Sequence, residues 1–197
     1  PSYENPIETM TTNAIGSASI LDALRRLNRP VVVLMITSDK AYDNVEWLWG
    51  YRETDRIGGK DPYSASKGMA ELVIKTYFES YFNNAESNVK IGIARAGNVI
   101  GGGDWAVDRI VADCMRSWST DEVVDIRSPN STRPWQHVLE PLSGYLYLAQ
   151  NLEQGGDNNG EVFNFGPSGH QDYSVRELIT EMSNYWDNVR WNDTSDA

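Results

Sequence analysis

Tyr63 and Lys67, four residues apart, are the first pair in this sequence with the types and spacing to do chemistry. They lie in the run Asp61-Pro62-Tyr63-Ser64-Ala65-Ser66-Lys67. Asp followed by Pro is typical of a helix start, and on a helix the Tyr and Lys side chains would share one face. A nearby ammonium favours the phenolate, which makes Tyr63 a candidate base. A Tyr-x-x-x-Lys pair is expected by chance roughly 0.25 times in a chain of this composition, so the pair alone is weak evidence.

A second group of chemical side chains directly follows a predicted strand. Residues 31–36, Val-Val-Val-Leu-Met-Ile, are continuously apolar and mostly β-branched, which predicts a parallel strand buried on both faces. Ser38, Asp39 and Lys40 then supply a hydroxyl, a carboxylate and an ammonium. Open α/β sheets bind their ligands at the carboxyl ends of the strands. The alternative interpretation is an ordinary polar exit from a strand.

The elements between these groups predict that they meet. Residues 89–96 predict a second strand, and the Tyr63 helix lies between the two strands in a β-α-β unit. Because parallel strands end at the same edge of a sheet, Asn98 and residues 38–40 would face one crevice near the start of that helix. The apolar stripe of the Tyr63 helix is either core or an interface with another subunit. The loop of residues 41–60 is long enough to be functional.

The outer segments carry further candidates. A helix is predicted from Asn5-Pro6 to Leu27, with Asn13 either on a solvated face or at the site. A short helix over 107–118 would carry Arg109, and a strand is predicted over 123–127. The loop 127–137 gathers side chains that suit phosphate oxygens or a flat ring, or else form surface ion pairs: Arg127, Arg133, Trp135 and Gln136. Later elements are a helix over 141–150, a strand over 162–166 and a capping-box helix from Ser174 to about Trp186.

Composition excludes several classes of function. The net charge of −11 argues against nucleic acid or an anionic membrane as the partner. The single cysteine, Cys114, excludes an internal disulfide and suits a cytoplasmic protein, and no apolar run approaches the length of a membrane span. His137 and His170 are too isolated for a metal site, so we expect none. The chain lacks an initiator Met and a signal peptide, and we expect it to be a piece of something longer.

Several motifs occur together and in the order of one family. They are Asn5-Pro-Ile-Glu-Thr with Asn13, Thr37-Ser-Asp-Lys-Ala-Tyr-Asp-Asn, Gly50-Tyr-Arg-Glu-Thr-Asp, Gly58-Gly-Lys-Asp-Pro-Tyr-Ser-Ala-Ser-Lys67, Arg95-Ala-Gly-Asn-Val-Ile-Gly-Gly-Gly-Asp-Trp105, Arg133-Pro-Trp-Gln-His-Val-Leu-Glu-Pro-Leu-Ser-Gly-Tyr145 and Asn164-Phe-Gly-Pro167. The chain thereby resembles the extended short-chain dehydrogenase/reductase family, and within it the branch of 4,6-dehydratases that act on CDP-glucose. The dTDP-glucose branch has Asp-Glu where this chain has Asp39-Lys40.

The resemblance implies an α/β fold, a partial Rossmann-type doubly wound parallel sheet with part of a small substrate-binding α/β region. Residues 1–105 would be the C-terminal part of the NAD-binding domain, with the catalytic residues. Residues 106–197 would be mainly the nucleotide-sugar region, incomplete, with some segments returning to the first domain. The glycine-rich NAD loop of the family, GxxGxxG, is absent from this chain, so we expect the chain alone to be inactive.

The resemblance also implies the reaction and the role of each residue. CDP-D-glucose would be oxidised at C4, lose water across C5 and C6, and be reduced at C6, in deoxysugar (O-antigen, lipopolysaccharide) biosynthesis. Tyr63 would take the O4 proton, Ser38 would bond O4, and Asp39 would protonate the departing O6 hydroxyl. Lys40 would handle the C5 proton, either as a neutral-amine base or as an electrostatic stabiliser of the enolate.

The remaining site residues are also carried over from the family. Lys67 would hold the nicotinamide ribose of NAD together with Tyr63, near Asn13. The CDP-sugar would be held by Asn98, Arg109, Arg127, Arg133 and Gln136, with Arg133 on the pyrophosphate. A homo-oligomer, dimer or tetramer, is expected. Rival interpretations are another nucleotide-sugar 4,6-dehydratase, an epimerase or decarboxylase of the family, and a non-catalytic nucleotide-sugar binding protein.

Overall fold

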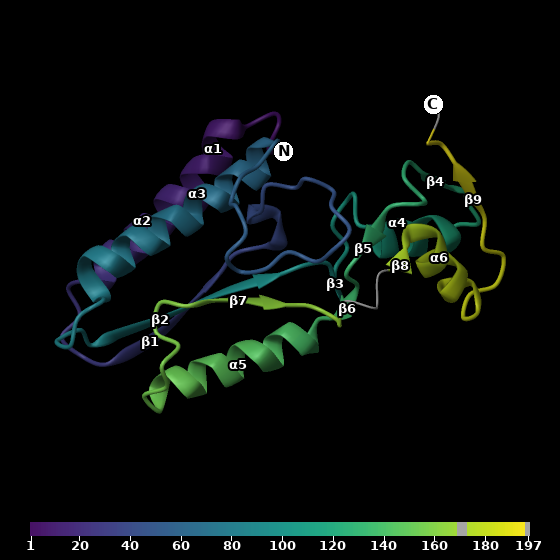
Figure 1. Cartoon of the computed structure of the whole chain (residues 1–197). Helices are drawn as coiled ribbons and strands as arrows, with labels where there is room; N and C mark the ends of the chain where they lie inside the picture. The colour runs from purple at the N-terminus through teal and green to yellow at the C-terminus, as the bar shows by residue number, and fades with distance from the viewer. Residues whose placement is uncertain (169–172, 196–197) are drawn as a thin grey trace. The chain divides into compact units, whose positions relative to one another are not determined.

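The chain divides into two compact units, shown in Figure 1. The first consists of Pro1–Gly97 and Leu139–Gly166, and the second of Asn98–Val138 and Pro167–Ala197. The structure, a computed structural model, describes residues 1–168 and 173–195. His170 lies outside these described residues. The assignment of NAD binding to one region and nucleotide-sugar binding to the other stays a prediction.

A parallel sheet of three strands forms the centre of the first unit. The strands are β1 (Val31–Ile36), β2 (Val89–Ala96) and β7 (Val162–Phe165), in the order β1-β2-β7. In the register, Val31 is opposite Val89, and Ile93 is opposite Val162. All three predicted strands are confirmed, and their parallel pairing places their carboxyl ends at one edge of the sheet.

Helices lie on both faces of this sheet, as Figure 1 shows. One face carries α1 (Pro6–Met10), the π-helical turn η1 (Thr11–Ile15), α2 (Gly16–Leu24), α3 (Pro62–Tyr77) and the π-helical turn η3 (Phe78–Phe82). The other face carries α5 (Leu139–Glu153). Leu21, Ile74 and Ile91 are fully buried between the first helices and the sheet, where apolar side chains stabilise the fold most. This arrangement agrees with the predicted α/β class.

Gly92 of β2 allows α5 to lie close to the sheet. A Cβ at this position would be 2.9 Å from Leu34 Cδ2 and 3.0 Å from the side chains of Leu148 and Leu152. Those distances are shorter than normal carbon–carbon contacts, so a larger residue would force these leucine side chains to move.

The first predicted helix differs in detail from the observed one. It ends at Leu24 rather than Leu27, and η1 interrupts it with a wider turn that no residue pattern had indicated. The side chain of Asn5 makes no capping bond; instead, the backbone carbonyl oxygen of Asn5 accepts from the N–H and the hydroxyl of Thr9. By contrast, the predicted cap of α3 is confirmed, because the Asp61 carboxylate accepts from the backbone N–H groups of Tyr63 and Ser64.

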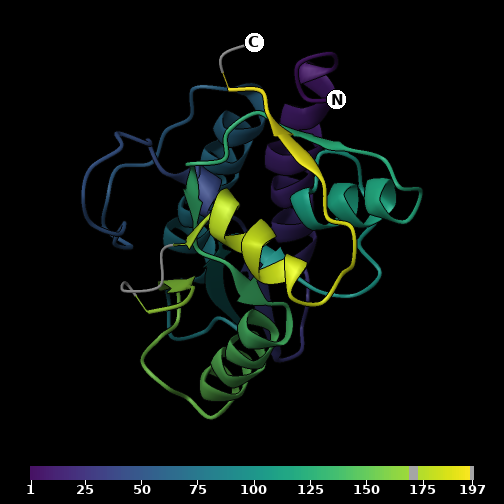
Figure 2. The same cartoon turned by 90° about the vertical axis from the view of Figure 1, so that its right-hand side faces the viewer.

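The second unit is built from short elements. They are β3 (Val99–Ile100), α4 (Ile110–Trp118), β4 (Val124–Ile126), β5 (Thr132–Arg133), β6 (Gln136–His137), β8 (Tyr173–Ser174), α6 (Val175–Ser183) and β9 (Trp191–Asp193). Pairs β3–β6 and β4–β9 are parallel and β5–β8 is antiparallel; Figure 2 shows β9 alongside β4. Cys114, Trp118 and Ile179 lie in its core, where burial raises the pKa of the Cys114 thiol to about 12.

Two helices of the second unit are shorter than predicted. The helix expected over 107–118 begins only at Ile110, because Asp108 has a left-handed backbone with φ of 64°. Arg109 is therefore the residue before the first helical turn rather than part of the helix. The capping box of Ser174 and Glu177 is confirmed, but α6 ends at Ser183, before Trp186.

Within residues 1–168 and 173–195, no helix is long and apolar enough to cross a membrane. The same residues contain no group of three or more His, Cys, Asp or Glu side chains that could hold a metal ion.

Candidate active site

The turn of residues 38–41, called here the 38–41 turn, directly follows β1. Ser38 begins the 3-10 helix η2 (Asp39–Ala41), and its Oγ accepts from the backbone N–H of Lys40 at 3.2 Å. The same hydroxyl donates to Asp39 Oδ1 at 3.0 Å, while Lys40 is exposed. A single serine hydroxyl therefore both shapes the turn and orients the neighbouring carboxylate.

Tyr63 and Lys67 lie on the first turns of α3, side by side as predicted. Lys67 Nζ is 5.8 Å from the centroid of the Tyr63 ring. The Tyr63 side chain is 40% exposed and thus open to a ligand. Lys67 is half-buried, and burial lowers the pKa of its ammonium. Among the residues that the structure describes, Lys67 makes no hydrogen bond or ion pair, so its three donors are available to a bound molecule.

The 38–41 turn and the start of α3 come together within the first unit. η2 packs against α3. Burial tends to raise the pKa of Asp61, but hydrogen bonds from Ser64 and Tyr63, together with the positive charge of Lys40, hold it below its usual range. A Cβ at Gly68 of α3 would be 3.5 Å from the carbonyl oxygen of Ala41, so η2 lies against the N-terminal half of α3. The structure therefore places a hydroxyl, a carboxylate, an ammonium, a phenol and a second ammonium at one end of the sheet.

Asn13 lies on η1 and is bonded to α3. Its Nδ2 donates to Ser66 Oγ at 2.9 Å, and that hydroxyl donates in turn to the carbonyl oxygen of Tyr63 at 2.7 Å. Asn13 is half-buried, so the alternative of a merely solvated helix face does not describe it. Its predicted contact with a cofactor stays a prediction.

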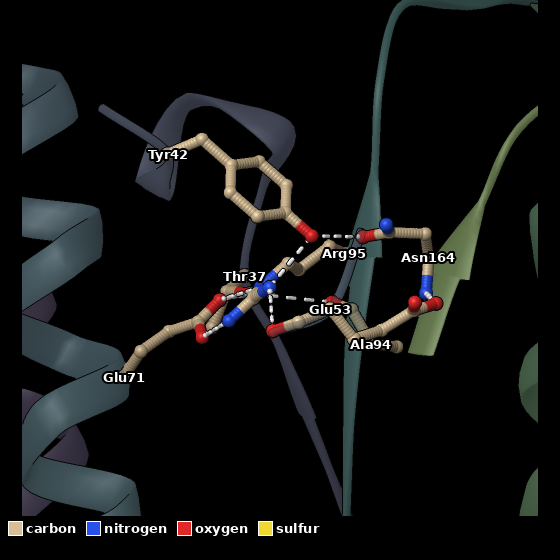
Figure 3. A network of polar contacts seen from close by, with 7 residues as sticks. All are labelled: Thr37, Tyr42, Glu53, Glu71, Ala94, Arg95 and Asn164. Atoms are coloured by element: carbon tan, nitrogen blue, oxygen red, sulfur yellow. Dashed lines mark hydrogen bonds and ion pairs between the residues drawn. The ribbon is translucent and has the colours of Figure 1, made fainter. Parts of the chain in front are cut away.

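A buried ion pair at the centre of the first unit was missed by the sequence analysis (Figure 3). Arg95 on β2 donates from Nε to Glu71 Oε1 at 2.6 Å, and its terminal NH2 group pairs with Glu71 Oε2. Burial disfavours the charge of Arg95, but the Glu71 carboxylate more than compensates and raises the pKa of the guanidinium. The sequence did contain one signal for this pair. Arg95 lies in a strand whose apolar pattern predicts burial on both faces, and a buried arginine must have a partner.

Stacked aromatic rings order the loop between η2 and α3. Tyr42 and Tyr51 stack with ring centroids 4.9 Å apart, and Trp47 lies 5.3 Å from Tyr51 and 5.5 Å from Trp49. The carbonyl oxygen of Tyr51 accepts from Asn164 Nδ2 at 3.0 Å, which joins the loop to the end of β7. The 43–60 loop is thus attached to the same edge of the sheet as the 38–41 turn.

The predicted substrate residues all lie in the second unit, and two of them are neighbours. The backbone N–H of Gln136 donates to the carbonyl oxygen of Asn98 at 3.1 Å, where β3 and β6 pair. Each of the three arginines has a partner close to it. Arg109 forms an ion pair with Asp104 at 3.8 Å and Arg127 one with Asp108 at 3.0 Å, and Arg133 donates to the carbonyl oxygen of Thr132 at 2.7 Å. Next to Gln136, the buried Trp135 Nε1 has no hydrogen-bond partner among the described residues.

The chain matches known proteins over most of its length. Residues 1–166 match the family model described as the NAD dependent epimerase/dehydratase family. The chain is 48% identical over 194 residues to the CDP-glucose 4,6-dehydratase of Salmonella typhimurium, covering 96% of this chain and 54% of that protein. It is 25% identical to UDP-glucuronic acid decarboxylase 5 of Arabidopsis thaliana, covering 91% of this chain and 51% of that protein. The chain therefore spans about half the length of the curated relatives it matches.

Solved structures agree on the fold. The UDP-glucuronic acid 4-epimerase of Bacillus cereus, in complex with UDP-glucuronic acid and NAD, matches with a TM-score of 0.79 at 18% identity, over 93% of this chain and 55% of its own. The dTDP-glucose 4,6-dehydratase DesIV of Streptomyces venezuelae, with NAD bound, matches with a TM-score of 0.74 at 20% identity, over 98% and 56%. The predicted Rossmann-type α/β fold is confirmed, and the chain belongs to the NAD dependent epimerase/dehydratase family.

Proposed function

We propose that the protein of which this chain forms a part is an NAD-dependent CDP-glucose 4,6-dehydratase, which converts CDP-D-glucose to CDP-4-keto-6-deoxy-D-glucose and water. The observation that carries this proposal is the packing of η2, which contains most of the 38–41 turn, against α3, the helix that carries Tyr63 and Lys67. Oxidation at C4 alone, as in an epimerase, would need only the phenol of Tyr63, the ammonium of Lys67 and the hydroxyl of Ser38. Asp39 and Lys40 add the two further groups that an elimination uses, an acid for the leaving hydroxyl and an amine at C5. The 48% identity to the Salmonella typhimurium enzyme supports the same choice.

The residues present fit a nicotinamide cofactor. Lys67 is half-buried with unused donors beside Tyr63, which suits the hydroxyls of a ribose. NAD+, when bound, supplies an acceptor for the hydride of C4 and returns that hydride to C6. Bringing NAD+ to this site also requires the glycine-rich loop, which the 197 residues lack. We therefore expect the chain alone to form no 4-keto product.

In the first half of the reaction, the sugar is oxidised at C4. Tyr63 takes the proton of O4 as the hydride leaves C4, and the nearby Lys67 ammonium stabilises the phenolate that begins the cycle. Ser38 donates a hydrogen bond to O4, which its position beside Asp39 allows once it turns from that carboxylate to the sugar.

In the second half, water is eliminated across C5 and C6. The new 4-keto group acidifies the C5–H bond. Lys40 either takes the C5 proton as a neutral amine, or stays an ammonium that stabilises the enolate while the proton passes to solvent. Asp39 gives a proton to the O6 hydroxyl, which leaves as water. After the hydride reaches C6 and a proton returns to C5, the product is the 6-deoxy-4-keto sugar.

The second unit supplies the candidates for binding the nucleotide. Asn98, Gln136 and the three arginines are proposed to hold the CDP-sugar, with Arg133 on the pyrophosphate, because guanidinium groups pair well with phosphate oxygens. We also propose a homo-oligomer. The apolar side chains that α3 exposes, Met69 and Leu72, are its candidate contact. The cytoplasmic location and the role in O-antigen biosynthesis stay predictions.

Turnover with three nucleotide sugars tests the proposed function. The complete protein is incubated with CDP-, dTDP- and UDP-glucose, and the 4-keto product is followed by its absorbance in alkali. We expect turnover with CDP-glucose, and a loss of about 10²- to 10⁴-fold in Tyr63→Phe because the proton acceptor is removed. Tyr147→Phe, an exposed tyrosine on α5, is the matched control and should retain full turnover.

Other outcomes decide between the alternatives. Preferred turnover of dTDP- or UDP-glucose would assign a sister dehydratase, and interconversion at C4 without loss of water would assign an epimerase. Unchanged turnover in Tyr63→Phe would refute the proposed mechanism and favour a protein that only binds nucleotide sugars.

A further inference from the structure

Both ends of the 38–41 turn are bonded to one buried ion pair. The pair is Glu71 of α3 with Arg95 of β2, and both side chains are almost fully buried. Thr37 comes directly before the turn and Tyr42 directly after it, and each makes a hydrogen bond to one member of the pair. Figure 3 shows these side chains converging from separate elements of the first unit.

At the front of the turn, Glu71 fixes Thr37. Thr37 Oγ1 donates to Glu71 Oε1 at 2.6 Å, and its backbone N–H donates to the carbonyl of Ala94 at 2.8 Å. Glu71 lies four residues after Lys67 and eight after Tyr63, so all three are on the same side of α3. One rigid helix and one side-chain hydrogen bond therefore connect the phenol and the ammonium to the start of the turn.

At the rear of the turn, Arg95 fixes Tyr42. One terminal nitrogen of Arg95 donates to the Tyr42 hydroxyl at 2.7 Å and to the carbonyl of Glu53 at 3.1 Å. The Tyr42 hydroxyl donates to Asn164 Oδ1 at 2.7 Å, and the guanidinium carbon lies 4.5 Å from the ring centroid. Burial raises the pKa of Tyr42, so its phenol remains protonated and keeps this donation at neutral pH.

We propose that Glu71 and Arg95 are positioning residues, which act through Thr37 and Tyr42 to align the 38–41 turn with Tyr63 and Lys67; this inference rests on the proposed function. Buried charges are expensive, and they persist where the bonds they make fix a geometry. The two halves of the reaction depend on the turn to different degrees. Oxidation at C4 uses Tyr63 and Lys67 of α3 with only Ser38 from the turn, whereas elimination at C5 and C6 uses Asp39 and Lys40, both in the turn. Loosening the turn while leaving α3 intact should therefore slow elimination more than oxidation.

Thr37→Val and Tyr42→Phe in the complete protein test this proposal. Each removes one hydroxyl, nearly preserves side-chain shape and leaves the ion pair itself in place. We expect kcat to fall about tenfold to a hundredfold in each, because small misplacements of catalytic groups have effects of that size. KM for CDP-glucose should stay within about twofold, since neither side chain is placed at the nucleotide.

Isotope effects separate positioning from general damage. With CDP-glucose deuterated at C5, the isotope effect on kcat should increase in both variants, and with CDP-glucose deuterated at C4 it should decrease. Amide hydrogen exchange of residues 38–42 should accelerate about tenfold, while that of residues 62–67 should not change. Thr37→Ser keeps the donor and should restore both properties.

Matched controls and contrary results complete the test. Thr76→Val also removes a threonine hydroxyl, but that hydroxyl bonds only the carbonyl of Leu72 within α3, so kcat and both isotope effects should be unchanged. Tyr147→Phe serves the same purpose for Tyr42→Phe. Unchanged isotope effects, or exchange that accelerates equally over 38–42 and 62–67, would overturn the proposal. If the wild-type protein converted no nucleotide sugar, the proposed function would fail, and the exchange measurement would still decide whether the pair fixes the turn.

Discussion

A buried ion pair in the first unit contrasts with an exposed ion pair in the second. In the first unit, the side chains of Arg95 and Glu71 are each 2% exposed, and they bond three further groups around them. In the second unit, the side chains of Arg127 and Asp108 are 80% and 72% exposed, and their pair joins two loop residues at 3.0 Å. An arginine–carboxylate pair is therefore a fixed part of the core in one unit and a surface contact in the other.

This difference matches what each region is proposed to do. A site that must align several reacting groups benefits from bonds that water cannot replace. A surface arginine in a weak pair can exchange its carboxylate for a phosphate oxygen at little cost. The first unit is thus suited to fixed geometry, and the exposed arginines of the second unit are suited to accepting an anionic ligand.

Glu71→Gln should have the largest effect on stability. The substitution keeps the shape of the side chain but leaves the Arg95 charge buried without a counter-charge, so we expect the free energy of unfolding to fall by about 3–5 kcal/mol. Urea denaturation of the complete protein measures this change. Glu79→Gln, at an exposed position in η3 beyond α3, is the matched control and should cost less than about 0.5 kcal/mol. A loss below about 1 kcal/mol in Glu71→Gln would mean that the buried pair is no more important than a surface pair.

The strands and the α3 cap could be predicted from the sequence, but the Glu71–Arg95 pair could not. The strands and the cap of α3 were predictable because their signals are local: β-branched runs, and Asp before Pro. The Glu71–Arg95 pair joins a helix and a strand 24 positions apart, and nothing local indicates which acid Arg95 meets. Only the presence of an Arg in an otherwise buried strand pointed to a partner.

The meeting of the candidate catalytic groups was predictable for a related reason. Parallel strands bring their carboxyl ends to one edge, so residues 38–40 and the start of α3 were expected to be close. The wider turn η1 and the bond from Asn13 to Ser66 were not predicted, because both depend on how two helices pack. Likewise, the late start of α4 depends on the left-handed backbone of Asp108, and Asp is not glycine, the usual signal for that conformation.

Ser174→Ala should have an intermediate effect, in the second unit. Here the order of α6 depends on a local cap, in which Ser174 Oγ accepts from the backbone N–H of Glu177 at 3.2 Å. Losing this cap should lower the free energy of unfolding by about 1 kcal/mol, measured by urea denaturation. Ser183→Ala, at the end of the same helix, should change it by less than about 0.5 kcal/mol. Equal losses from both substitutions would indicate that packing, and not the cap, stabilises α6.

Asp108→Asn should have the smallest effect and tests the surface side of the comparison. The pair with Arg127 is solvated, so its loss should cost less than about 0.5 kcal/mol. Asn also tolerates the left-handed backbone at this position, with φ of 64°, so the substitution introduces no new strain. A double-mutant cycle with Arg127→Gln, followed by urea denaturation, isolates the interaction between the two side chains. A coupling above about 1 kcal/mol would place this pair with the buried one, and Arg127 would then be a structural residue instead of a cation available to a phosphate.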